Sequence, residues 1–389
     1  MKTKKNQKNN PLSPLELSML DKLVVQKRRN KQTMRIVVYL GKSRPRGRVD
    51  YGLKLIEQLE RDGHYIAGLM VEQDDPIIMY PGVKVKKHII MPKELCTYLS
   101  VIKKNIYENP SFCNKFSEIC KKIQNCQADI GVVFFGYWVP PEIYTIPKNG
   151  FINYHPGPLP WLRGMEPDTF AILENWKRIW GSVHKVVAGF DAGSIIARTK
   201  KAKIELYDTP VSVLNTLTAS GIDTICNVIS SFSRKGNFSS VKLPQLGSLA
   251  TLKKAYDYSF INWQNDTNDM LRRRLLAFCG QDIGIRLKAG FNDLHYVVYN
   301  LELHKGKFKG VPGDILGYYI CRGKYLLQPI VRTTEGVCVV LLGDKILPER
   351  KIPEGHVHSD WIIPPRKQKM VTHRRWIKKS IEVFNKYSN

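Results

Sequence analysis

Two short apolar runs constrain the fold of this chain more than any other feature of its sequence. Residues 35–40 read RIVVYL and residues 130–135 read IGVVFF, with no charged side chain after the first arginine. Continuous apolar strands of this kind are typical of parallel sheets, which helices cover on both faces. Each run ends at a glycine, Gly41 and Gly136, where a strand can give way to a loop. The runs therefore predict an α/β domain built on a parallel sheet.

Helical and strand-like segments alternate along the rest of the first 241 residues. An amphipathic pattern at residues 51–61 and a strand pattern at residues 65–71 complete a βαβ unit with the first run. Further strands are predicted at residues 150–154, 183–187 and 194–197. The loop after the first strand lacks a GxGxxG motif, so a standard dinucleotide site is not indicated. We predict a doubly wound α/β domain over residues 34–241.

The pattern changes after a predicted linker at residues 242–254. One helix is predicted at residues 268–278. Short alternating strands follow at residues 295–304, 314–320, 325–331 and 336–342. Glycine- and proline-containing turns such as GVPG separate these strands. Several short strands at this spacing predict a small β-barrel over residues 255–346.

The chain is strongly basic, with 61 Lys and Arg against 34 Asp and Glu and a formal charge of +27. Residues 1–33 and 347–389 are interpreted as basic extensions that flank the two domains. A surplus of this size favours a polyanionic partner, because neutralised phosphates release counterions. The alternative is a lysine-rich chain whose tails are only solvated, and the charge alone leaves both interpretations open.

The eight cysteines are scattered and form no CxxC pair, which argues against a zinc ribbon and against a disulfide framework. No metal site is predicted. No run of about 18 apolar residues is free of charge, so we expect no membrane span. These features predict a cytoplasmic protein, while the basic start of the chain leaves organelle targeting open.

Polar residues that can take part in catalysis concentrate at the end of one predicted strand. They lie in residues 151–164, which read FINYHPGPLPWLRG. Asn153 and His155 alternate along the strand, so both side chains are expected on one face with Tyr154 opposite. Ligands of open α/β sheets bind at the carboxyl ends of the strands. Asp191 follows in a Gly-Phe-Asp-Ala-Gly turn that would return its carboxylate to the same cleft.

An Asn, a His and an Asp that meet at one cleft suit the transfer of an acyl group to an amine. The imidazole stabilises or protonates the developing oxyanion, and the amide donates to the same oxygen. The carboxylate orients the imidazole and helps move the proton of the attacking nitrogen. No Ser or Cys nucleophile stands in an elbow motif, which favours direct transfer. A single His at a strand end equally suits a structural role.

The order Asn-x-His-Pro, Leu-Pro, Arg-Gly and Asp-x-Gly-x-Ile resembles the folate-dependent formyltransferase family. The resemblance implies a Rossmann-like formyltransferase domain, catalytic roles for Asn153, His155 and Asp191, and 10-formyltetrahydrofolate as donor. Residues after 255 are similar to the C-terminal domain of methionyl-tRNA formyltransferases, which implies an OB-like barrel. Contacts with the folate are implied for Gly136, Trp138, Val139, Pro156, Leu159, Pro160, Ala192 and Gly193.

The acceptor implied by the resemblance is a primary amine, and the amino group of initiator methionyl-tRNA is favoured by the surplus charge. The substrate-binding residues would be Arg44, Arg46, Arg48 and Arg163. The alternative acceptor is an amino sugar on a nucleotide-linked sugar, which needs only a small pocket with a few cationic groups. A third hypothesis is a retired fold that only binds RNA, and the intact Asn, His and Asp set argues against it.

Overall fold

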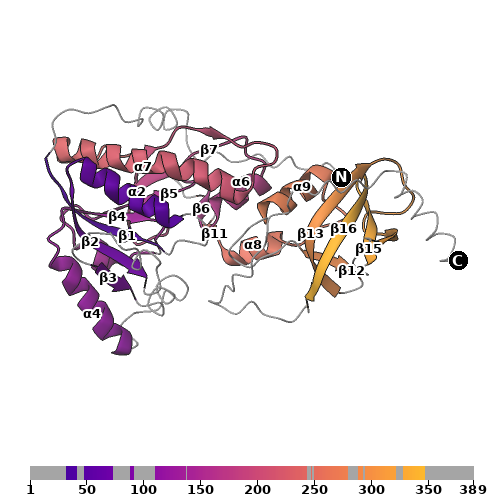
Figure 1. The fold of residues 1–389 in the computed structure, drawn as a ribbon, viewed down its shortest axis with the longest axis horizontal. Helices are drawn as coiled ribbons and strands as arrows, with labels where there is room; N and C mark the ends of the chain where they lie inside the picture. The colour runs from indigo at the N-terminus through magenta and orange to yellow at the C-terminus, as the bar shows by residue number, and fades with distance from the viewer. Residues whose placement is uncertain are drawn as a thin grey trace. The chain divides into compact units, whose positions relative to one another are not determined.

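The computed structural model describes residues 32–41, 48–72, 88–91, 110–136, 138–242, 247, 249–278, 288–291, 294–320 and 327–346. The basic extensions predicted at residues 1–33 and 347–389 thus lie almost entirely outside the described residues. Contacts divide the chain into two units (Figure 1). The first comprises residues 1–167, 178–203 and 214–249, and the second comprises residues 168–177, 204–213 and 250–389. The domain limits expected from the sequence stay predictions.

The first unit is built on a seven-stranded mixed sheet with the strand order β3-β2-β1-β4-β5-β8-β9 (Figure 1). Its strands are β1 (Arg35–Leu40), β2 (Tyr65–Glu72), β3 (His88–Met91), β4 (Ile130–Phe134), β5 (Phe151–His155), β8 (Ser182–Lys185) and β9 (Ile195–Arg198). The strands β3, β2, β1, β4 and β5 run parallel, whereas β8 and β9 are each antiparallel to their neighbour. The predicted α/β class is confirmed, with two antiparallel strands added to the parallel sheet.

Helices cover both faces of this sheet because its central strands are apolar on both sides. Ile36, Val38 and Leu40 of β1 pack in one core cluster with α2 (Arg48–Arg61) and α7 (Pro210–Lys235). Val37 and Tyr39 of the same strand pack in a second cluster with α4 (Pro110–Gln124). All five residues of β4 are buried. The unbroken apolar runs of the sequence therefore reflect burial from two sides.

At the carboxyl end of β5, the sheet continues into the antiparallel strands β8 and β9. In the register of β5 and β8, Asn153 lies opposite His184 and His155 lies opposite Ser182. The next pairing brings Arg198 of β9 opposite Ser182. The antiparallel strands thus carry residues from two later segments to the edge where β5 ends.

Short elements complete the chain around these strands. They are α5 (Pro141–Tyr144), β6 (Arg163–Gly164), α6 (Pro167–Leu173), β7 (Arg178–Ile179), β10 (Ala202–Lys203) and β11 (Leu249–Ala250). Of these, β7 pairs with β10 in a small antiparallel ribbon. The cysteines Cys120, Cys126, Cys226 and Cys338 are free thiols. Among the described residues, no helix combines the length and apolar character needed to cross a membrane.

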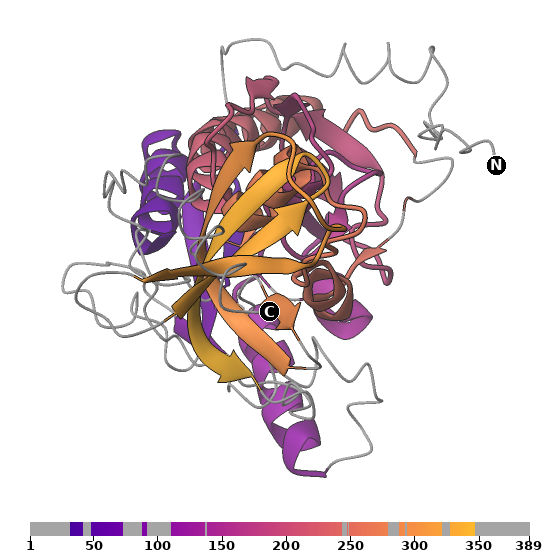
Figure 2. The same cartoon turned by 90° about the vertical axis from the view of Figure 1, so that its right-hand side faces the viewer.

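The second unit contains a five-stranded antiparallel half-barrel with the order β12-β13-β16-β15-β14, drawn in orange to yellow in Figure 2. Its elements are α8 (Leu252–Tyr258), α9 (Asn268–Ala277), β12 (Lys288–Phe291), β13 (Leu294–Lys305), β14 (Ile315–Ile320), β15 (Leu327–Thr333) and β16 (Gly336–Ile346). Thr267 caps α9, because its side chain accepts a hydrogen bond from the backbone N–H of Met270 at 3.2 Å. The small barrel expected from the strand spacing is confirmed as a half-barrel, and β12 was not foreseen.

A buried lysine lies where β12 begins. Lys288 is 6% exposed. Its Nζ lies 3.6 Å from the ring centroid of Tyr256 and 4.8 Å from that of Phe260. Burial lowers the pKa of Lys288 from 10.5 to about 8, a drop worth roughly 3 kcal/mol. The attraction of an ammonium to aromatic rings contributes about 2 kcal/mol when desolvated. Burial therefore outweighs the rings, and the ammonium destabilises this unit at neutral pH.

Replacing Lys288 with Met is expected to raise the melting temperature at pH 7 by a few degrees, on the order of 1 kcal/mol. The pKa is lowered in the folded state, so wild-type stability rises with pH between about 8 and 10.5. The advantage of the variant should therefore shrink as the pH approaches 10. Thermal unfolding of the full chain measures it, with the exposed Lys309→Met as control. A destabilised Lys288→Met protein at pH 7 would show that the rings dominate.

Candidate active site

Strand β5 presents its alternate residues to different environments. Tyr154 is 1% exposed and packs in the core, where its hydroxyl donates to the carbonyl oxygen of Leu217 at 2.6 Å. Asn153 and His155 project from the other face, as the alternation predicted. Asn153 is half-buried and His155 is 4% exposed. The core contact of Tyr154 therefore fixes the direction in which its two polar neighbours point.

The loop after His155 closes over its imidazole. Nε2 of His155 lies 2.6 Å from the carbonyl oxygen of Leu162, so this ring nitrogen carries a proton and donates. A Cβ at Gly157 would lie 2.8 Å from the same nitrogen, which explains the glycine. The hydroxyl of Ser182 donates to the carbonyl of Gly157 at 2.8 Å and accepts from the N–H of Leu159 at 3.2 Å. Strand β8 thus anchors the loop that holds the imidazole.

A tight turn carries Asp191 back to the end of β5. The backbone of Asp191 has a φ of +44°, in the left-handed region that few side chains adopt. A Cβ at Gly193 would lie 1.8 Å from the carbonyl oxygen of Lys185, so only glycine permits this close approach. The backbone N–H of Gly164 donates to Oδ2 of Asp191 at 2.8 Å. The turn and β6 together fix the position of the carboxylate.

Arg163 holds this turn in place. Its Nε donates to the carbonyl oxygen of Phe190 at 3.2 Å, and Nη1 donates to that of Gly247 at 3.1 Å. The sequence resemblance had suggested a substrate contact for Arg163. The guanidinium is instead engaged by two backbone carbonyls, so the geometry indicates a residue that positions Asp191.

Three polar side chains surround the Asp191 carboxylate. Oδ2 lies 3.6 Å from Nδ1 of His155. Oδ1 lies 3.4 Å from Nε2 of His184 and 3.4 Å from Nδ2 of Asn153. Nδ2 of Asn153 also lies 3.1 Å from Nε2 of His184. The structure thus brings together the three residues expected from the sequence and adds one, His184.

The electrostatics of the cluster keep the carboxylate charged. Burial by itself raises the pKa of Asp191. The imidazoles of His155 and His184 and the N–H of Gly164 act in the opposite direction and outweigh burial. They hold the pKa of Asp191 well below its ordinary value, so this side chain is an ionised carboxylate at neutral pH.

His184 was missed by the sequence reasoning. Nδ1 of His184 lies 2.9 Å from the carbonyl oxygen of Lys185 and therefore donates to it. Nε2 of His184 faces both Nδ2 of Asn153 at 3.1 Å and Oδ1 of Asp191 at 3.4 Å. The sequence held a signal for this residue, because His184 lies in a predicted strand seven residues before Asp191. The signal becomes decisive only with the antiparallel register of β5 and β8, which sequence patterns do not fix.

The residues with implied folate contacts divide into two groups. Trp138 lies after β4, its Nε1 donates to the carbonyl of Ala188 at 3.0 Å, and its ring centroid is 6.2 Å from that of Phe190. Gly136, Pro156 and Ala192 are also partly exposed near the ends of β4 and β5 and in the Asp191 turn. Val139, Leu159, Pro160 and Gly193 are buried. This second group is packed within the loops that surround the cluster.

Arg44 and Arg46, which were expected to contact a substrate, lie outside the described residues, as does the side chain of Arg48. Within the described ranges, no group of three or more His, Cys, Asp or Glu residues could hold a metal ion.

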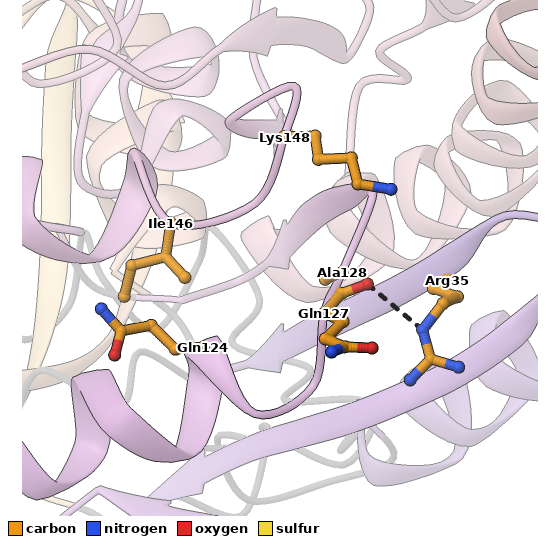
Figure 3. Close-up of a pocket in the computed structure, with 6 residues that line it drawn as sticks. All are labelled: Arg35, Gln124, Gln127, Ala128, Ile146 and Lys148. Atoms are coloured by element: carbon orange, nitrogen blue, oxygen red, sulfur yellow. Dashed lines mark hydrogen bonds between the residues drawn. The ribbon is translucent and has the colours of Figure 1, made fainter.

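A hollow of about 410 Å³ lies at the opposite edge of the sheet, where β1 and β4 begin (Figure 3). Arg35 and Lys148 contribute the charges on its walls. Nη2 of Arg35 donates to the carbonyl of Cys126 at 2.8 Å, and Nζ of Lys148 pairs with Asp129 at 2.9 Å. These cations hold the end of α4 and the start of β4, so the hollow is interpreted as a structural junction.

Comparison with known proteins finds one family and several distant relatives. Residues 96–229 match the sequence model of the formyl transferase family. The methionyl-tRNA formyltransferase of Bacillus mycoides (strain KBAB4) is 27% identical over 194 residues, which cover 47% of this chain and 55% of that protein. The enzyme of the same name from Sulfurihydrogenibium sp. (strain YO3AOP1) is 27% identical over 274 residues, or 69% of this chain and 83% of that protein.

The fold has a solved counterpart in a multiply substituted variant of HypX from Aquifex aeolicus. The TM-score is 0.50 at 15% identity, over 79% of this chain and 44% of that chain. The fold and the site define an α/β domain that carries a cluster of Asn, His and Asp side chains at the carboxyl end of β5. The chain is similar to the formyl transferase family over residues 96–229, about a third of its length. Its match spans only 55% of the length of the Bacillus relatives.

Replacing Asp191 with Asn is expected to destabilise the protein by about 2 kcal/mol at pH 7, because two buried imidazoles lose a charged partner. The lowered pKa of Asp191 means that its contribution is present above about pH 5 and is lost as the pH falls below about 4. The difference between variant and wild type should therefore narrow toward pH 3. Urea unfolding at each pH measures it, with the exposed Asp223→Asn as control. A difference that stays constant with pH would contradict this assignment.

Proposed function

We propose that this protein transfers the formyl group of 10-formyltetrahydrofolate to a primary amine. The observation that carries the proposal is the meeting of Asn153, His155 and Asp191 at the carboxyl end of β5. A structural role alone would not require an ionised carboxylate shared by two imidazoles and an amide at a strand end. The similarity of residues 96–229 to the formyl transferase family supports the same chemistry.

The proposed reaction uses the cluster to stabilise charge on both reacting partners. The neutral amine attacks the formyl carbon, so a C–N bond forms and negative charge develops on the formyl oxygen. The amide N–H of Asn153 and an imidazole N–H of His155 are the donors for this oxygen. Asp191 stabilises the positive charge on the attacking nitrogen. The attacking nitrogen then gives a proton to the folate nitrogen that carried the formyl group. The bond between that folate nitrogen and the formyl carbon breaks, which releases tetrahydrofolate.

The resting geometry implies a rearrangement when substrates bind. Nδ2 of Asn153 donates to Asp191 and also faces Nε2 of His184, and Nε2 of His155 donates to the carbonyl of Leu162. A formyl oxygen in the cleft must therefore replace one of these acceptors. Among the hydrogen-bond donors of the cluster, Asn153 is half-buried, whereas both imidazoles are buried. We therefore assign the first contact with the formyl oxygen to Asn153.

The donor side of the cleft is assigned to the segment after β4. Trp138 and Phe190 are both partly exposed and their rings lie 6.2 Å apart at an angle of 46°. Flat aromatic surfaces beside the Asp191 turn fit the flat bicyclic ring of a folate. The folate would supply the formyl carbon, and these side chains would orient it toward Asn153.

For the acceptor we propose the amino group of initiator methionyl-tRNA. The sequence relatives described above are methionyl-tRNA formyltransferases, and the chain carries a net charge of +27. A net positive charge of this size favours the binding of a large polyanionic acceptor such as tRNA. An amino sugar on a nucleotide-linked sugar is the alternative acceptor, which the same catalytic cluster would serve.

A transfer assay separates these acceptors. The full chain is supplied with 10-formyltetrahydrofolate and either charged initiator tRNA or a panel of amino-sugar nucleotides. We expect formyl-methionyl-tRNA as the product. Transfer only to an amino sugar would overturn the assignment of the acceptor. Transfer to neither would overturn the proposed function.

Substitution of the cluster tests its role directly. His155→Ala is expected to reduce kcat by two or more orders of magnitude, because a donor to the oxyanion and a partner of Asp191 are both lost. The KM for the donor should change by less than about threefold, since Trp138 and Phe190 are intact. Steady-state kinetics measure both constants. His304→Ala is the matched control, because His304 pairs with Glu302 at 2.9 Å in the second unit. Near-normal turnover of His155→Ala would contradict the assigned role.

A further inference from the structure

A surface of basic and aromatic side chains surrounds the β7–β10 ribbon. We call it the β7–β10 basic patch, and it consists of Trp161, Arg178, Trp180, Arg198, Lys200 and Lys201. The ribbon is labelled β7 in Figure 1. Arg178, Lys200 and Lys201 are exposed, and the remaining three residues are half-buried. All six belong to the first unit.

The aromatic rings at the centre of the patch organise its cations. Cζ of Arg198 lies 5.7 Å from the ring centroid of Trp180, and Nζ of Lys201 lies 5.2 Å from it. Trp161 packs edge-to-face against Trp180 with centroids 6.0 Å apart. Indole rings attract cations and restrict their side chains. The patch is therefore an ordered array of charge on a rigid aromatic base.

The cations of the patch repel one another. The pKa of Lys201 is lowered by burial first, and then by the charges of Arg198 and Arg178. Burial also lowers the pKa of Arg198. Like charges held this close cost free energy in the isolated protein. An anion that binds among them removes this repulsion, so the patch is suited to a polyanionic partner.

The patch lies at the same sheet edge as the catalytic cluster. Arg198 ends β9 opposite Ser182, which lies opposite His155. Trp161 directly precedes Leu162, whose carbonyl accepts the hydrogen bond of His155. An anion bound to the patch would therefore lie beside the loop that holds the catalytic imidazole.

The order of the strands separates this patch from the donor side of the cleft. Across the sheet the strands follow the order β4-β5-β8-β9, and Asn153 and His155 both come from β5. Trp138 and the proposed donor site follow β4, on one side of β5. Arg198 ends β9, on the other side of β5. A donor and an acceptor that meet at β5 would approach from these opposite sides.

We infer that the β7–β10 basic patch binds phosphates of an RNA acceptor and holds the acceptor amine at the catalytic cluster. This inference rests on the proposed function and specifies its substrate class. Four cations spread over two strand ends and a loop exceed what one small nucleotide needs. Cationic and aromatic side chains together suit RNA, which offers phosphates and unstacked bases.

The test removes three charges from the patch and leaves its aromatic base intact. The triple variant carries Arg178→Gln, Lys200→Gln and Lys201→Gln. The matched control carries Lys54→Gln, Lys115→Gln and Lys121→Gln, which removes three exposed charges from α2 and α4. Fluorescence anisotropy of labelled, unacylated initiator tRNA measures its affinity for each full-length protein at several salt concentrations.

We expect the patch variant to bind tRNA about tenfold or more weakly at about 50 mM salt. The slope of the logarithm of its binding constant against the logarithm of the salt concentration should become smaller in magnitude by about two to three. The control should stay within about threefold of the wild type. Equal affinity of the patch variant and the wild type, in proteins with the same melting temperature, would overturn the inference. A loss that the control variant matches would also overturn it, because a general charge effect would then suffice.

Formyl transfer by the same proteins distinguishes the failure of this inference from failure of the proposed function. We expect kcat/KM for charged tRNA to fall with the tRNA affinity while the KM for the donor stays unchanged. Transfer that is unaffected in the patch variant would overturn the inference and leave the proposed function intact. Patch-dependent tRNA binding without any formyl transfer would support the patch and overturn the proposed function. A raised KM only for a donor with a polyglutamate tail would assign the patch to the donor and overturn the inference.

Discussion

The buried carboxylate of Asp191 is the constraint on which the rest of the catalytic unit depends. A charge removed from water is costly unless several partners surround it. Its partners come from three separate segments: His155 on β5, His184 on β8, and the backbone N–H of Gly164 on β6. A shift of any one of these segments by a residue would take its partner away from the carboxylate. The register of the sheet and the position of the charge are therefore parts of one requirement.

The change of strand direction at β8 meets this requirement. In a parallel β8, the last residues of that strand would lie beside the carboxyl end of β5 in place of Ser182. The antiparallel pairing instead puts His184 directly opposite Asn153 and Ser182 directly opposite His155. Ser182 then fastens the loop after His155 through Gly157 and Leu159, so one short strand supplies both an imidazole and an anchor.

Sequence patterns predicted the features that depend on local chemistry. The apolar runs at β1 and β4 identified buried strands, and the alternation of Asn153 and Tyr154 separated a polar face from a core face. They did not predict contacts that depend on register or on loop closure. His184 and the use of Arg163 as a clamp on the Asp191 turn belong to this second kind. The strand β12 also escaped prediction, because its four residues, KAGF, include an alanine, a glycine and a lysine, which have low strand propensity.

The same electrostatic rule explains both the catalytic cluster and the β7–β10 basic patch, with opposite results. Around Asp191 the protein supplies the opposing dipoles and imidazoles itself, so the pKa is lowered and the charge is satisfied within the fold. Around Lys201 the neighbouring charges are cations, so the pKa is also lowered, although here this disfavours the charged form. The Asp191 carboxylate has its partners within the fold and helps to position the cluster. The cations around Lys201 repel one another, which favours the binding of an anion from outside the protein. The two arrays meet at Leu162 and Trp161, adjacent residues of one loop, which is why binding at the patch would place an acceptor beside the catalytic imidazole.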